Sequence, residues 1–422
     1  MPGERLTALA HQTGAIRRMR KIKPNHLLGA LCLLALHGSC SLRLVAMFTG
    51  VLGGYKLSKQ ALAQRINDAW SHLFSRILSC ILAKSVRIQA ASGLFSFFKR
   101  VLVQDSTTLA LPQKLAAHFP GSGNQNKKHN AMIRLQTIVD LLSETFVHFS
   151  ITPFTHNDQR AASHILEIIS CGDLIIRDLG YFVPLVFRSI TDKMAYFLTR
   201  YHHKTTLLYA DGKKIDLLAL LKKIHSLDMW VLLGQEARVP VRLVCIPVPE
   251  SVANERRRKL HNNKKRDRRL NPSKEQIALC GWTILITNVP ASVWTIQAVS
   301  NAYGVRWRIE TIFKAWKSHF NFTELTNGCK DYVLILIYTR LIFITLFQVT
   351  FVGLENWIAS NTRGTSLSML KFAQCYALLV TMAFASTVIN SESLMINILN
   401  HCTYEKRRKR LSYGDIRQCI LN

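Results

Sequence analysis

The chain is 422 residues long, enough for several domains, and 49% of its residues are hydrophobic. That share excludes a wholly disordered chain, because such chains lack the apolar residues that a buried core needs. Fifty-five Lys and Arg face 25 Asp and Glu, a formal net charge of +30, which favours a polyanionic partner: nucleic acid or an anionic membrane surface.

The first 95 residues are predicted to be helical. In residues 57–83, apolar side chains recur at steps of three and four residues, the spacing of one helix face. They are Leu62, Ile66, Trp70, Leu73 and Ile77. Because basic residues lie nearby, we interpret residues 1–95 as an N-terminal helical DNA-binding region. A helix that only packs against the rest of the protein fits the same spacing.

Short β-type runs begin after this region. The run KRVLVQ (99–104) ends directly before Asp105. After a polar loop, two β-rich runs, 132–141 and 144–154, are joined around Ser143 in the pattern of a hairpin.

A helix and two more strands follow. Residues 157–170 are predicted to be helical, with Asn157 or Asp158 as the N-cap. The run DLIIR (173–177) precedes a second aspartate, and AYFLTR (195–200) is a further strand candidate. Three strands, a helix and two strands are the skeleton of a ribonuclease H-like sheet, so the sequence predicts an α/β fold.

Residues 203–290 interrupt this pattern with a β-rich insertion. Its β-type pieces lie at 205–212, 241–249 and 277–290. Between the last two is a tract, 256–269, with nine Lys or Arg and one Asp. We favour DNA contact over a merely charged loop, because such clusters usually neutralise phosphates. The residues assigned to DNA contact here are Arg256, Arg257, Arg258, Lys264, Lys265 and Arg266.

The remainder of the chain is predicted to be helical. A long helix is expected over 293–320, and further helices lead to a second basic cluster at 406–410. Residues 332–354 are long and apolar enough to span a bilayer, but Arg340 and Gln348 lie inside them. A central arginine costs roughly 2.5–3.5 kcal/mol on insertion scales, so a buried helix is favoured over a membrane anchor.

Ten cysteines are scattered along the chain, without CxxC pairs or zinc-finger spacing. A disulfide framework is not expected in a chain of this size without a secretory signal. We therefore predict reduced thiols in a cytoplasmic protein.

Two aspartates, Asp105 and Asp178, each follow a β run. A sheet can direct two such carboxylates at a common point, and carboxylates suit Mg²⁺ or Mn²⁺, which prefer oxygen ligands. Two-metal phosphoryl transfer needs ligands that hold two ions about 3.5–4 Å apart. A single Asp after a strand usually only forms a turn or cap, so a third carboxylate is needed to support this chemistry.

The long helix predicted after the insertion carries a third carboxylate among cations. Tyr303, Arg306, Glu310 and Lys317 lie at offsets of 0, 3, 7 and 14. At about 100° per residue they fall within about 60° of one another around the helix, with Lys314 close to the same stripe. Such a face can hold a metal ligand beside a phosphate that cations grip. A solvated face with ordinary salt bridges fits the same spacing.

This spacing resembles the YREK motif of the insertion-sequence-four family of bacterial DDE transposases. The run YGVRWRIETIFKAWK is particularly close to that family. Two further blocks agree with it: QDSTTLALP around Asp105, with FPGSGN downstream, and IIRDLGYF around Asp178. The resemblance covers about residues 100–320, and three motifs in the correct order are more specific than any one of them.

The resemblance implies a ribonuclease H-like catalytic core with a β-rich insertion, flanked by N- and C-terminal helical regions. It implies that Asp105, Asp178 and Glu310 are the catalytic carboxylates and bind two Mg²⁺ ions, for which Mn²⁺ can substitute. The expected domains are an N-terminal region, 1–95; the core, 96–202 and 291–325; the insertion, 203–290; and a C-terminal dimerisation region, 326–422.

Further residues receive DNA-binding roles from the same resemblance. Those expected to grip phosphates near the scissile bond are Tyr303, Arg306 and Lys317, and Lys314 is assigned to DNA binding because it lies close to the same stripe. Arg200, at the end of a β run, is expected to contact DNA. Trp282 is the candidate for stacking a flipped base, a contact worth roughly 1–3 kcal/mol. A buried core tryptophan fits that position nearly as well.

The expected function is that of a cut-and-paste transposase. As a homodimer it would bind the terminal inverted repeats of a bacterial insertion sequence, cleave the ends through a hairpin and join the 3′-hydroxyls to target DNA. Its expected location is the bacterial cytoplasm, with the nucleoid and not at a membrane. The alternative is a non-catalytic DNA-binding or regulatory transposase copy, and a basic membrane-associated protein is a third hypothesis.

Overall fold

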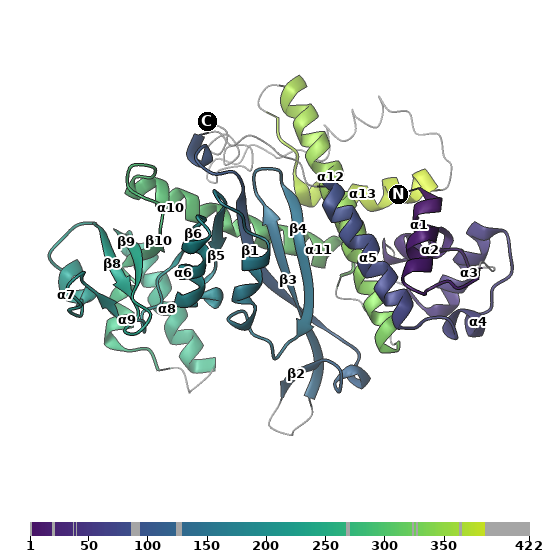
Figure 1. Cartoon of the computed structure of the whole chain (residues 1–422), viewed down its shortest axis with the longest axis horizontal. Helices are drawn as coiled ribbons and strands as arrows, with labels where there is room; N and C mark the ends of the chain where they lie inside the picture. The colour runs from purple at the N-terminus through teal and green to yellow at the C-terminus, as the bar shows by residue number, and fades with distance from the viewer. Residues whose placement is uncertain are drawn as a thin grey trace. The chain divides into compact units, whose positions relative to one another are not determined.

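The computed structural model describes residues 2–18, 22–36, 38, 40–85, 93–123, 129–266, 271–322, 325, 328–362 and 365–384. The chain forms two compact units, each assembled from segments far apart in the sequence (Figure 1). Unit 1 comprises residues 1–89, 106–156 and 308–419, and unit 2 comprises 90–105, 157–307 and 420–422. The basic cluster at 406–410 and the end of the insertion tract, 267–269, lie outside the described residues.

Unit 1 contains the helices from both ends of the chain. From the N-terminal part come α1 (Gly3–Gln12), α2 (Pro24–Leu36), α3 (Leu42–Gly53), α4 (Lys59–Ala63) and α5 (Asp68–Ser85). From the C-terminal part come α11 (Arg308–His319), α12 (Lys330–Asn361) and α13 (Met369–Phe384). The prediction of helical flanks is thus confirmed for the described residues.

Helix α12 contains residues 332–354, the candidate membrane anchor. Among the described helices it alone is long and apolar enough to cross a bilayer, with a mean hydropathy of 2.0 in its most apolar stretch. However, 72% of that stretch is buried inside the protein, as in the core helix of a soluble fold. It packs against α2 and α5, and the Tyr332 hydroxyl donates to the Cys40 carbonyl over 2.6 Å.

The predicted helix at 57–83 is two helices. Helix α4 ends at Ala63 and α5 begins at Asp68, because Asn67 caps a new helix by accepting from the Trp70 N–H over 3.4 Å. Four of the five predicted apolar positions are buried, while Ile66, at the break, is half-buried. The periodicity therefore identified the buried face but not the break.

The predicted hairpin of unit 1 is confirmed. Strand β3 (His129–Asp140) pairs antiparallel with β4 (Thr145–Pro153), and the short β2 (Pro120–Gly123) pairs antiparallel with the first residues of β3, 129–131. In the turn, the Ser143 hydroxyl lies 2.8 Å from both the Asp140 carboxylate and the Thr145 hydroxyl. These hydrogen bonds satisfy the buried polar groups of the turn.

Unit 2 is built on parallel strands. The first half of β1 (Val101–Ala110) pairs parallel with β5 (Leu174–Arg177). Strand β5 pairs parallel with β6 (Tyr196–Arg200), reached through α6 (Pro184–Asp192). Strand β1 is also hydrogen-bonded to β3, which gives the order β4–β3–β1–β5–β6. This order, with the hairpin antiparallel and β1, β5 and β6 parallel, is the ribonuclease H-like topology that the sequence predicted.

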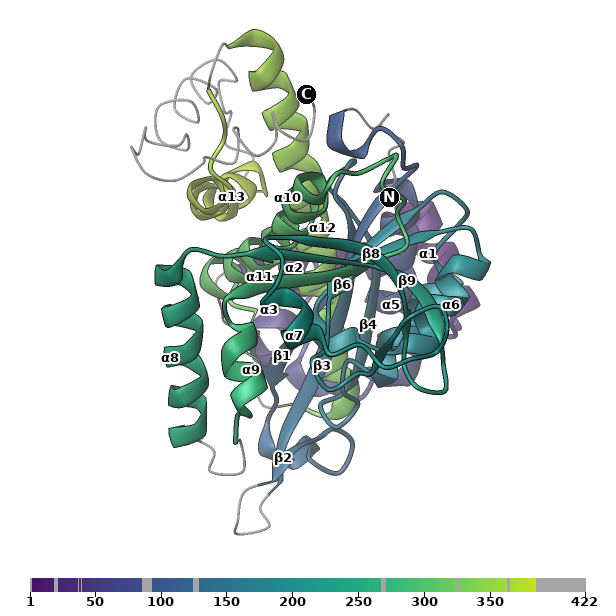
Figure 2. The same ribbon diagram turned by 90° about the vertical axis from the view of Figure 1, so that its left-hand side faces the viewer.

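The insertion extends the sheet of unit 2 instead of forming a separate one. Strand β10 (Trp282–Thr287) pairs antiparallel with β6, and β9 (Val239–Pro247), β8 (Leu227–Leu233) and β7 (Leu207–Leu208) follow outward. The insertion is thus β-rich, as predicted, although β8 was not foreseen. Its helices are α7 (Leu217–Leu221), α8 (Glu250–Arg266) and α9 (Lys274–Leu279), and α8 lies at the margin of the view in Figure 2.

The helix predicted at 157–170 is wrong in type and length. The structure has a 3₁₀ segment, η3 (Arg160–Glu167). Asn157 does accept from the Arg160 N–H over 3.1 Å, as an N-cap would. However, side chains from β1 and β5 donate to the Ala161 and Ala162 carbonyls, which are therefore occupied by partners outside the helix.

Candidate active site

Strands β1 and β5 place Asp105 and Asp178 side by side in unit 2. Gln104 of β1 is in register with Arg177 of β5, and each is followed by one of the two aspartates. Neighbouring strands lie roughly 4.8 Å apart, so equivalent side chains on one face can reach the same ion. At the other end of this pair, an ion pair between Arg100 and Asp173 (2.5 Å) joins the strands.

The expectation that both aspartates end a strand is right for Asp178 and wrong for Asp105. Strand β5 ends at Arg177, and Asp178 opens a 3₁₀ turn, η4 (Leu179–Tyr181). Strand β1 continues to Ala110, because it has β3 as a second partner. The side chain of Asp178 does not take the cap hydrogen bond of η4.

Two buried polar residues lie directly before the aspartates. Gln104 and Arg177 are each 1% exposed and donate to the η3 carbonyls of Ala161 (3.4 Å) and Ala162 (2.6 Å). Successive strand residues point to opposite faces, so these contacts fix the strands from the face opposite the carboxylates. Burial lowers the pKa of Arg177 to about 9. This pair was not predicted from the sequence, where the signal for it is a polar residue at the end of each apolar run.

A cluster of cations and a phenol lies next to Asp105. The Arg306 guanidinium contacts the Asp105 carboxylate at 3.2 Å. The guanidinium carbons of Arg200 and Arg306 lie 5.5 and 6.0 Å from the ring centroid of Tyr303. Burial raises the pKa of the Tyr303 phenol, an effect that the two arginines oppose and Asp178 reinforces. The structure therefore brings together five predicted site residues of unit 2.

The predicted helix at 293–320 is broken. Helix α10 (Ile296–Gly304) gives way to a 3₁₀ turn, η5 (Val305–Trp307), and α11 begins at Arg308. A 3₁₀ turn advances by about 120° per residue, so the single helix face drawn from the sequence is not formed. Tyr303 is near the end of α10 and Arg306 is in η5.

Glu310, Lys314 and Lys317 belong to α11 of unit 1. All three are exposed, and their spacing of four and three residues places them on one face of the helix. The opposite face is buried through Ile309, Ile312, Phe313 and Trp316. Part of the predicted stripe is thus present on α11.

The aspartate pair fits hard divalent cations. Asp105 is 18% exposed and Asp178 is half-buried, so their oxygens are accessible from solvent. Carboxylate oxygens are the ligands that Mg²⁺ and Mn²⁺ prefer. Within the described ranges, no three His, Cys, Asp or Glu side chains are grouped closely enough to hold an ion.

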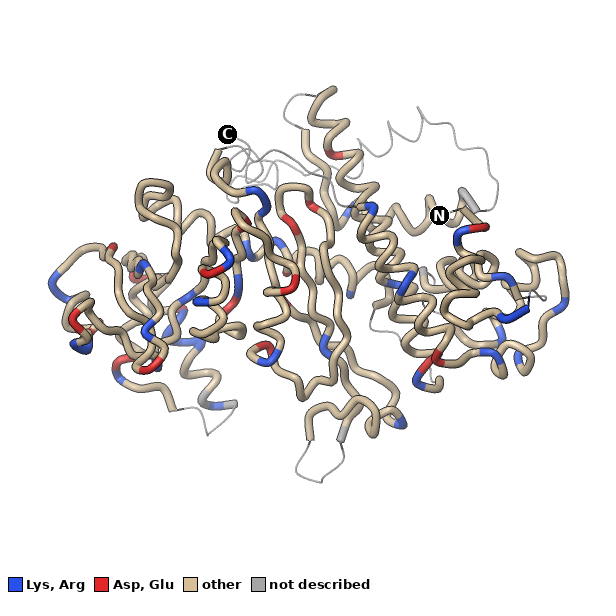
Figure 3. The backbone as a smooth tube through the Cα atoms, in the orientation of Figure 1, with Lys and Arg blue, Asp and Glu red and all other residues tan. Residues whose placement is uncertain are grey.

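The basic tract is helical over its described part, residues 256–266. Figure 3 shows its lysines and arginines along α8. Arg256 turns inward and donates to the Trp282 carbonyl (2.8 Å) and the Thr283 hydroxyl (3.1 Å). Arg257 contacts Glu250 of the same helix at 2.6 Å. Arg258 and Lys265 are exposed. The side chains of Lys264 and Arg266 lie outside the described part.

The contacts of Arg256 give it a structural role in docking α8 onto β10, and DNA contact by this residue stays a prediction. Trp282 is the first residue of β10 and is half-buried. It is therefore neither a fully buried core tryptophan nor a fully exposed ring.

One buried ion pair of unit 1 was not foreseen. Arg308, the first residue of α11, contacts Glu144 of the β3–β4 turn at 2.7 Å, with the two side chains 9% and 8% exposed. Since Arg308 stands two residues before Glu310, this pair fixes the start of the helix that carries the third carboxylate. Arg308 falls between the motif positions, so the motif gave no reason to select it.

Comparisons with known proteins show which family the chain is similar to. The family described as "Transposase DDE domain" matches residues 96–346. The transposase for insertion sequence element IS231D of Bacillus thuringiensis subsp. finitimus is 26% identical over 371 residues, covering 82% of this chain and 76% of the relative. The putative transposase InsL for insertion sequence element IS186A of Escherichia coli (strain K12) is 26% identical over 330 residues, covering 75% and 82%. A solved piggyBac transposase synaptic complex with hairpin DNA aligns at a TM-score of 0.45 and 12% identity, covering 97% and 84%.

Proposed function

Because this chain belongs to the transposase DDE domain family, we propose that it is the transposase of a bacterial insertion sequence that cleaves DNA at terminal inverted repeats and joins the ends to target DNA. The names of the two relatives from Bacillus thuringiensis and Escherichia coli, both transposases for insertion sequence elements, support the substrate class. The observation that carries the catalytic part is the position of Asp105 and Asp178, each directly after one of two residues, Gln104 and Arg177, that are in register on adjacent parallel strands.

Asp105, Asp178 and Glu310 are proposed to hold two Mg²⁺ ions, with Mn²⁺ as a substitute. When bound, the ions activate the attacking water or 3′-hydroxyl and stabilise the leaving oxygen. The two aspartates supply hard oxygen ligands from a rigid sheet, which fixes their separation. This rigidity supports a metal role, because ligands held in place need no rearrangement when the ions bind.

The neighbouring cations are proposed to bind the DNA backbone. Arg306 and Arg200 present guanidinium groups that can donate two hydrogen bonds to one phosphate. The Tyr303 phenol is protonated at neutral pH, and burial raises its pKa further above that range, so the phenol can donate a hydrogen bond to the same backbone. Lys314 and Lys317 are proposed to add positive charge from the exposed face of α11.

Two further surfaces are proposed to bind DNA. One is α8, through exposed basic side chains. The other is the N-terminal helical region, where Lys59 and Gln60 are exposed at the start of α4. Lysine neutralises phosphates and glutamine can read a base edge, so together they suit a duplex of defined sequence. Gln60→Ala tests this second surface. If the variant still distinguished the repeat duplex from a scrambled duplex as well as the wild type does, the surface would not read the repeat.

Replacing Arg258 and Lys265 of α8 together by alanine is expected to weaken DNA binding equally for all sequences. Each phosphate contact contributes about 0.9 to the slope of log affinity against log salt, so the slope should fall by about 2. Fluorescence anisotropy over a KCl series measures it. Lys213→Ala is the matched control, because Lys213 is an exposed lysine of unit 2 outside α8. An unchanged slope in the double variant would exclude α8 from the DNA path.

The remaining steps are also proposals. Cleavage is proposed to pass through a hairpin, with the half-buried Trp282 stacking a flipped base. The active species is proposed to be a homodimer on paired ends, located in the cytoplasm with the nucleoid. Hairpin products that persist in Trp282→Ala would contradict the stacking role.

The proposed function is tested by incubating the protein with DNA that carries the inverted repeats flanking its gene. With Mg²⁺ we expect nicked and hairpin strands on a denaturing gel, and with EDTA we expect none, because the carboxylates alone cannot activate water. Mn²⁺ should restore cleavage. Binding without cleavage under all metal conditions would instead support the alternative of a non-catalytic DNA-binding copy.

A further inference from the structure

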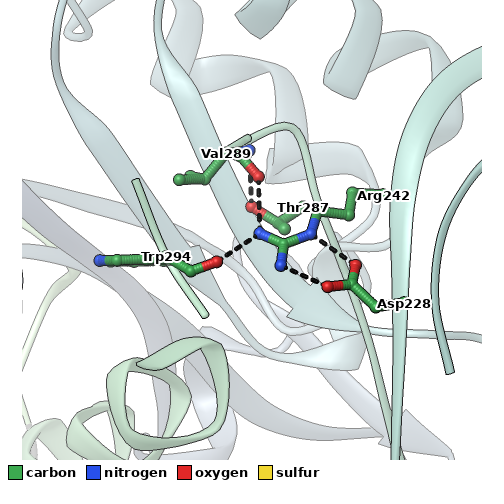
Figure 4. Close-up of polar contacts among 5 residues, drawn as sticks. All are labelled: Asp228, Arg242, Thr287, Val289 and Trp294. Atoms are coloured by element: carbon green, nitrogen blue, oxygen red, sulfur yellow. Dashed lines mark hydrogen bonds and ion pairs between the residues drawn. The ribbon is translucent and has the colours of Figure 1, made fainter. Parts of the chain in front are cut away.

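Arg242 of β9 is among the largest fully buried side chains, and its guanidinium is hydrogen-bonded on every side (Figure 4). Its Nε and Nη2 atoms each donate to one Asp228 oxygen over 2.7 Å. Its Nη1 atom donates to the carbonyls of Val289 (3.2 Å) and Trp294 (2.8 Å). We call these four residues the Arg242 cluster.

The two carbonyls belong to the connection between β10 and α10, residues 288–295. This connection is fixed from a second side as well. The Trp294 indole donates to the Leu94 carbonyl over 2.8 Å, and its ring centroid lies 5.0 Å from that of Phe98. Phe98 precedes β1, the strand of Asp105. The connection is therefore held between β9 and the entry to β1.

Helix α10 continues from this connection to the candidate active site. Thr295 caps the helix by accepting from the Ala298 N–H over 3.2 Å. Tyr303 is near its other end, and Arg306 follows in η5 and contacts Asp105. Because a helix of nine residues is a rigid rod of roughly 13 Å, a displacement of its first turn moves Tyr303 as well.

The core does not require a charge at this position. The neighbours of Arg242 along β9 are buried and apolar: Val241, Leu243 and Val244. A buried ion pair is seldom more stabilising than apolar residues of similar volume, so stability gives little reason for an arginine here. An apolar side chain, however, could not donate hydrogen bonds to the two carbonyls of the connection. Arg242 can do so while Asp228 holds its guanidinium in place.

On the basis of the proposed function, we propose that Arg242 is a positioning residue for DNA cleavage. Held by Asp228, it fixes the start of α10 and thereby the placement of Tyr303 and Arg306 against Asp105. Its effect is chiefly on the rate of cleavage, because the affinity for DNA is shared with the proposed contacts of α8 and α11, which Arg242 does not position.

The first test compares Arg242→Met/Asp228→Asn, which leaves no unpaired buried charge, with Val231→Ala. Val231 is a buried β8 residue outside the cluster, so its variant loosens the same strands by lost packing alone. We expect single-turnover cleavage at saturating DNA to fall about 10- to 100-fold in the first variant, as for a misplacement of about 1 Å. Its DNA affinity and the cleavage rate of Val231→Ala should stay within about twofold of wild type. Equal losses in both variants would overturn the proposal.

A second test asks whether Arg242 acts through Tyr303. If it does, adding Tyr303→Phe to the Arg242 variant should slow cleavage no further than the slower parent, because coupled residues are not additive. Independent, multiplicative losses would overturn the proposal. Should the double charge variant fail to fold, Arg242→Lys serves in its place, since it keeps the ion pair with Asp228 but cannot also reach both carbonyls.

Hydrogen exchange separates this proposal from the proposed function, because it needs no DNA. The amides of α10 are expected to exchange at least about tenfold faster in the Arg242 variant and at the wild-type rate in Val231→Ala. Unchanged exchange in α10 would overturn the positioning role even if the protein cleaves DNA. Faster exchange in a protein that never cleaves would refute the proposed function instead.

Discussion

Replacing Asp105 or Asp178 with asparagine is expected to reduce cleavage of inverted-repeat DNA by about a thousandfold. Asparagine keeps the size of the side chain and one oxygen, but it loses the negative charge that holds a divalent ion. Metal ions stabilise such transition states by several kcal/mol, and each 1.36 kcal/mol corresponds to a factor of ten in rate. The measurement is single-turnover nicking of end-labelled duplex with Mg²⁺, and Glu310→Gln should behave in the same way.

The matched control is Asp192→Asn. Asp192 is an exposed aspartate at the end of α6 in the same unit as the two aspartates, so its replacement changes net charge equally and should leave cleavage unaltered. DNA affinity should be unchanged or tighter in the active-site variants, since a carboxylate near phosphate is removed. Wild-type nicking by Asp105→Asn or Asp178→Asn would remove that residue from the catalytic centre.

Replacing Arg308 with methionine is expected to lower the free energy of unfolding by about 3–5 kcal/mol. The change leaves Glu144 buried without the cation that contacts it at 2.7 Å, and an uncompensated buried carboxylate is strongly unfavourable. Urea unfolding followed by circular dichroism measures the loss. Cleavage should fall too, because Arg308 begins the helix that carries Glu310.

A double variant distinguishes the effect of the lost ion pair from the effect of lost packing around Arg308. Adding Glu144→Gln to Arg308→Met removes the buried charge and should recover most of the stability. Lys259→Met is the control, because Lys259 pairs with Glu255 on the surface, where solvent screens such pairs and leaves them little effect on stability. If Arg308→Met were no more destabilising than Lys259→Met, the buried pair would have no structural importance.

The general fold could be predicted because local patterns decide it. Asp178 follows a short apolar run, LIIR, whose length and isoleucines favour a buried strand, and the hairpin around Ser143 follows from two β-rich runs and their turn. The placement of Asp105 beside Asp178 also follows from the sequence, once both runs are parallel neighbours. The spacing of the YREK-like motif then predicted Glu310 as the third carboxylate.

What could not be predicted depends on breaks in helices and on contacts between distant residues. Gly304, directly before η5, was the available signal that the helix at 293–320 would not continue, since glycine favours helix ends. The helical conformation of residues 256–266 did not follow from their charge, because charge indicates exposure to solvent and not conformation. Lys, Arg and Glu nevertheless favour helices.

The buried polar contacts were beyond any sequence pattern. Arg242 meets acceptors 14, 47 and 52 residues away, and Arg308 meets Glu144 across 164 residues. No periodicity or motif links positions so far apart, so these residues were found only when the fold brought their elements together.

The division of the chain into interleaved units limits which shortened products of this reading frame can fold. A polypeptide that stops before residue 308 contains every residue of unit 2 except its last three, but it lacks α11, α12 and α13 of unit 1. Helices α2 and α5 would then lose α12, against which they pack, and Cys40 would lose the hydroxyl of Tyr332. Premature termination at this point would therefore leave the N-terminal helices without the partner against which they pack.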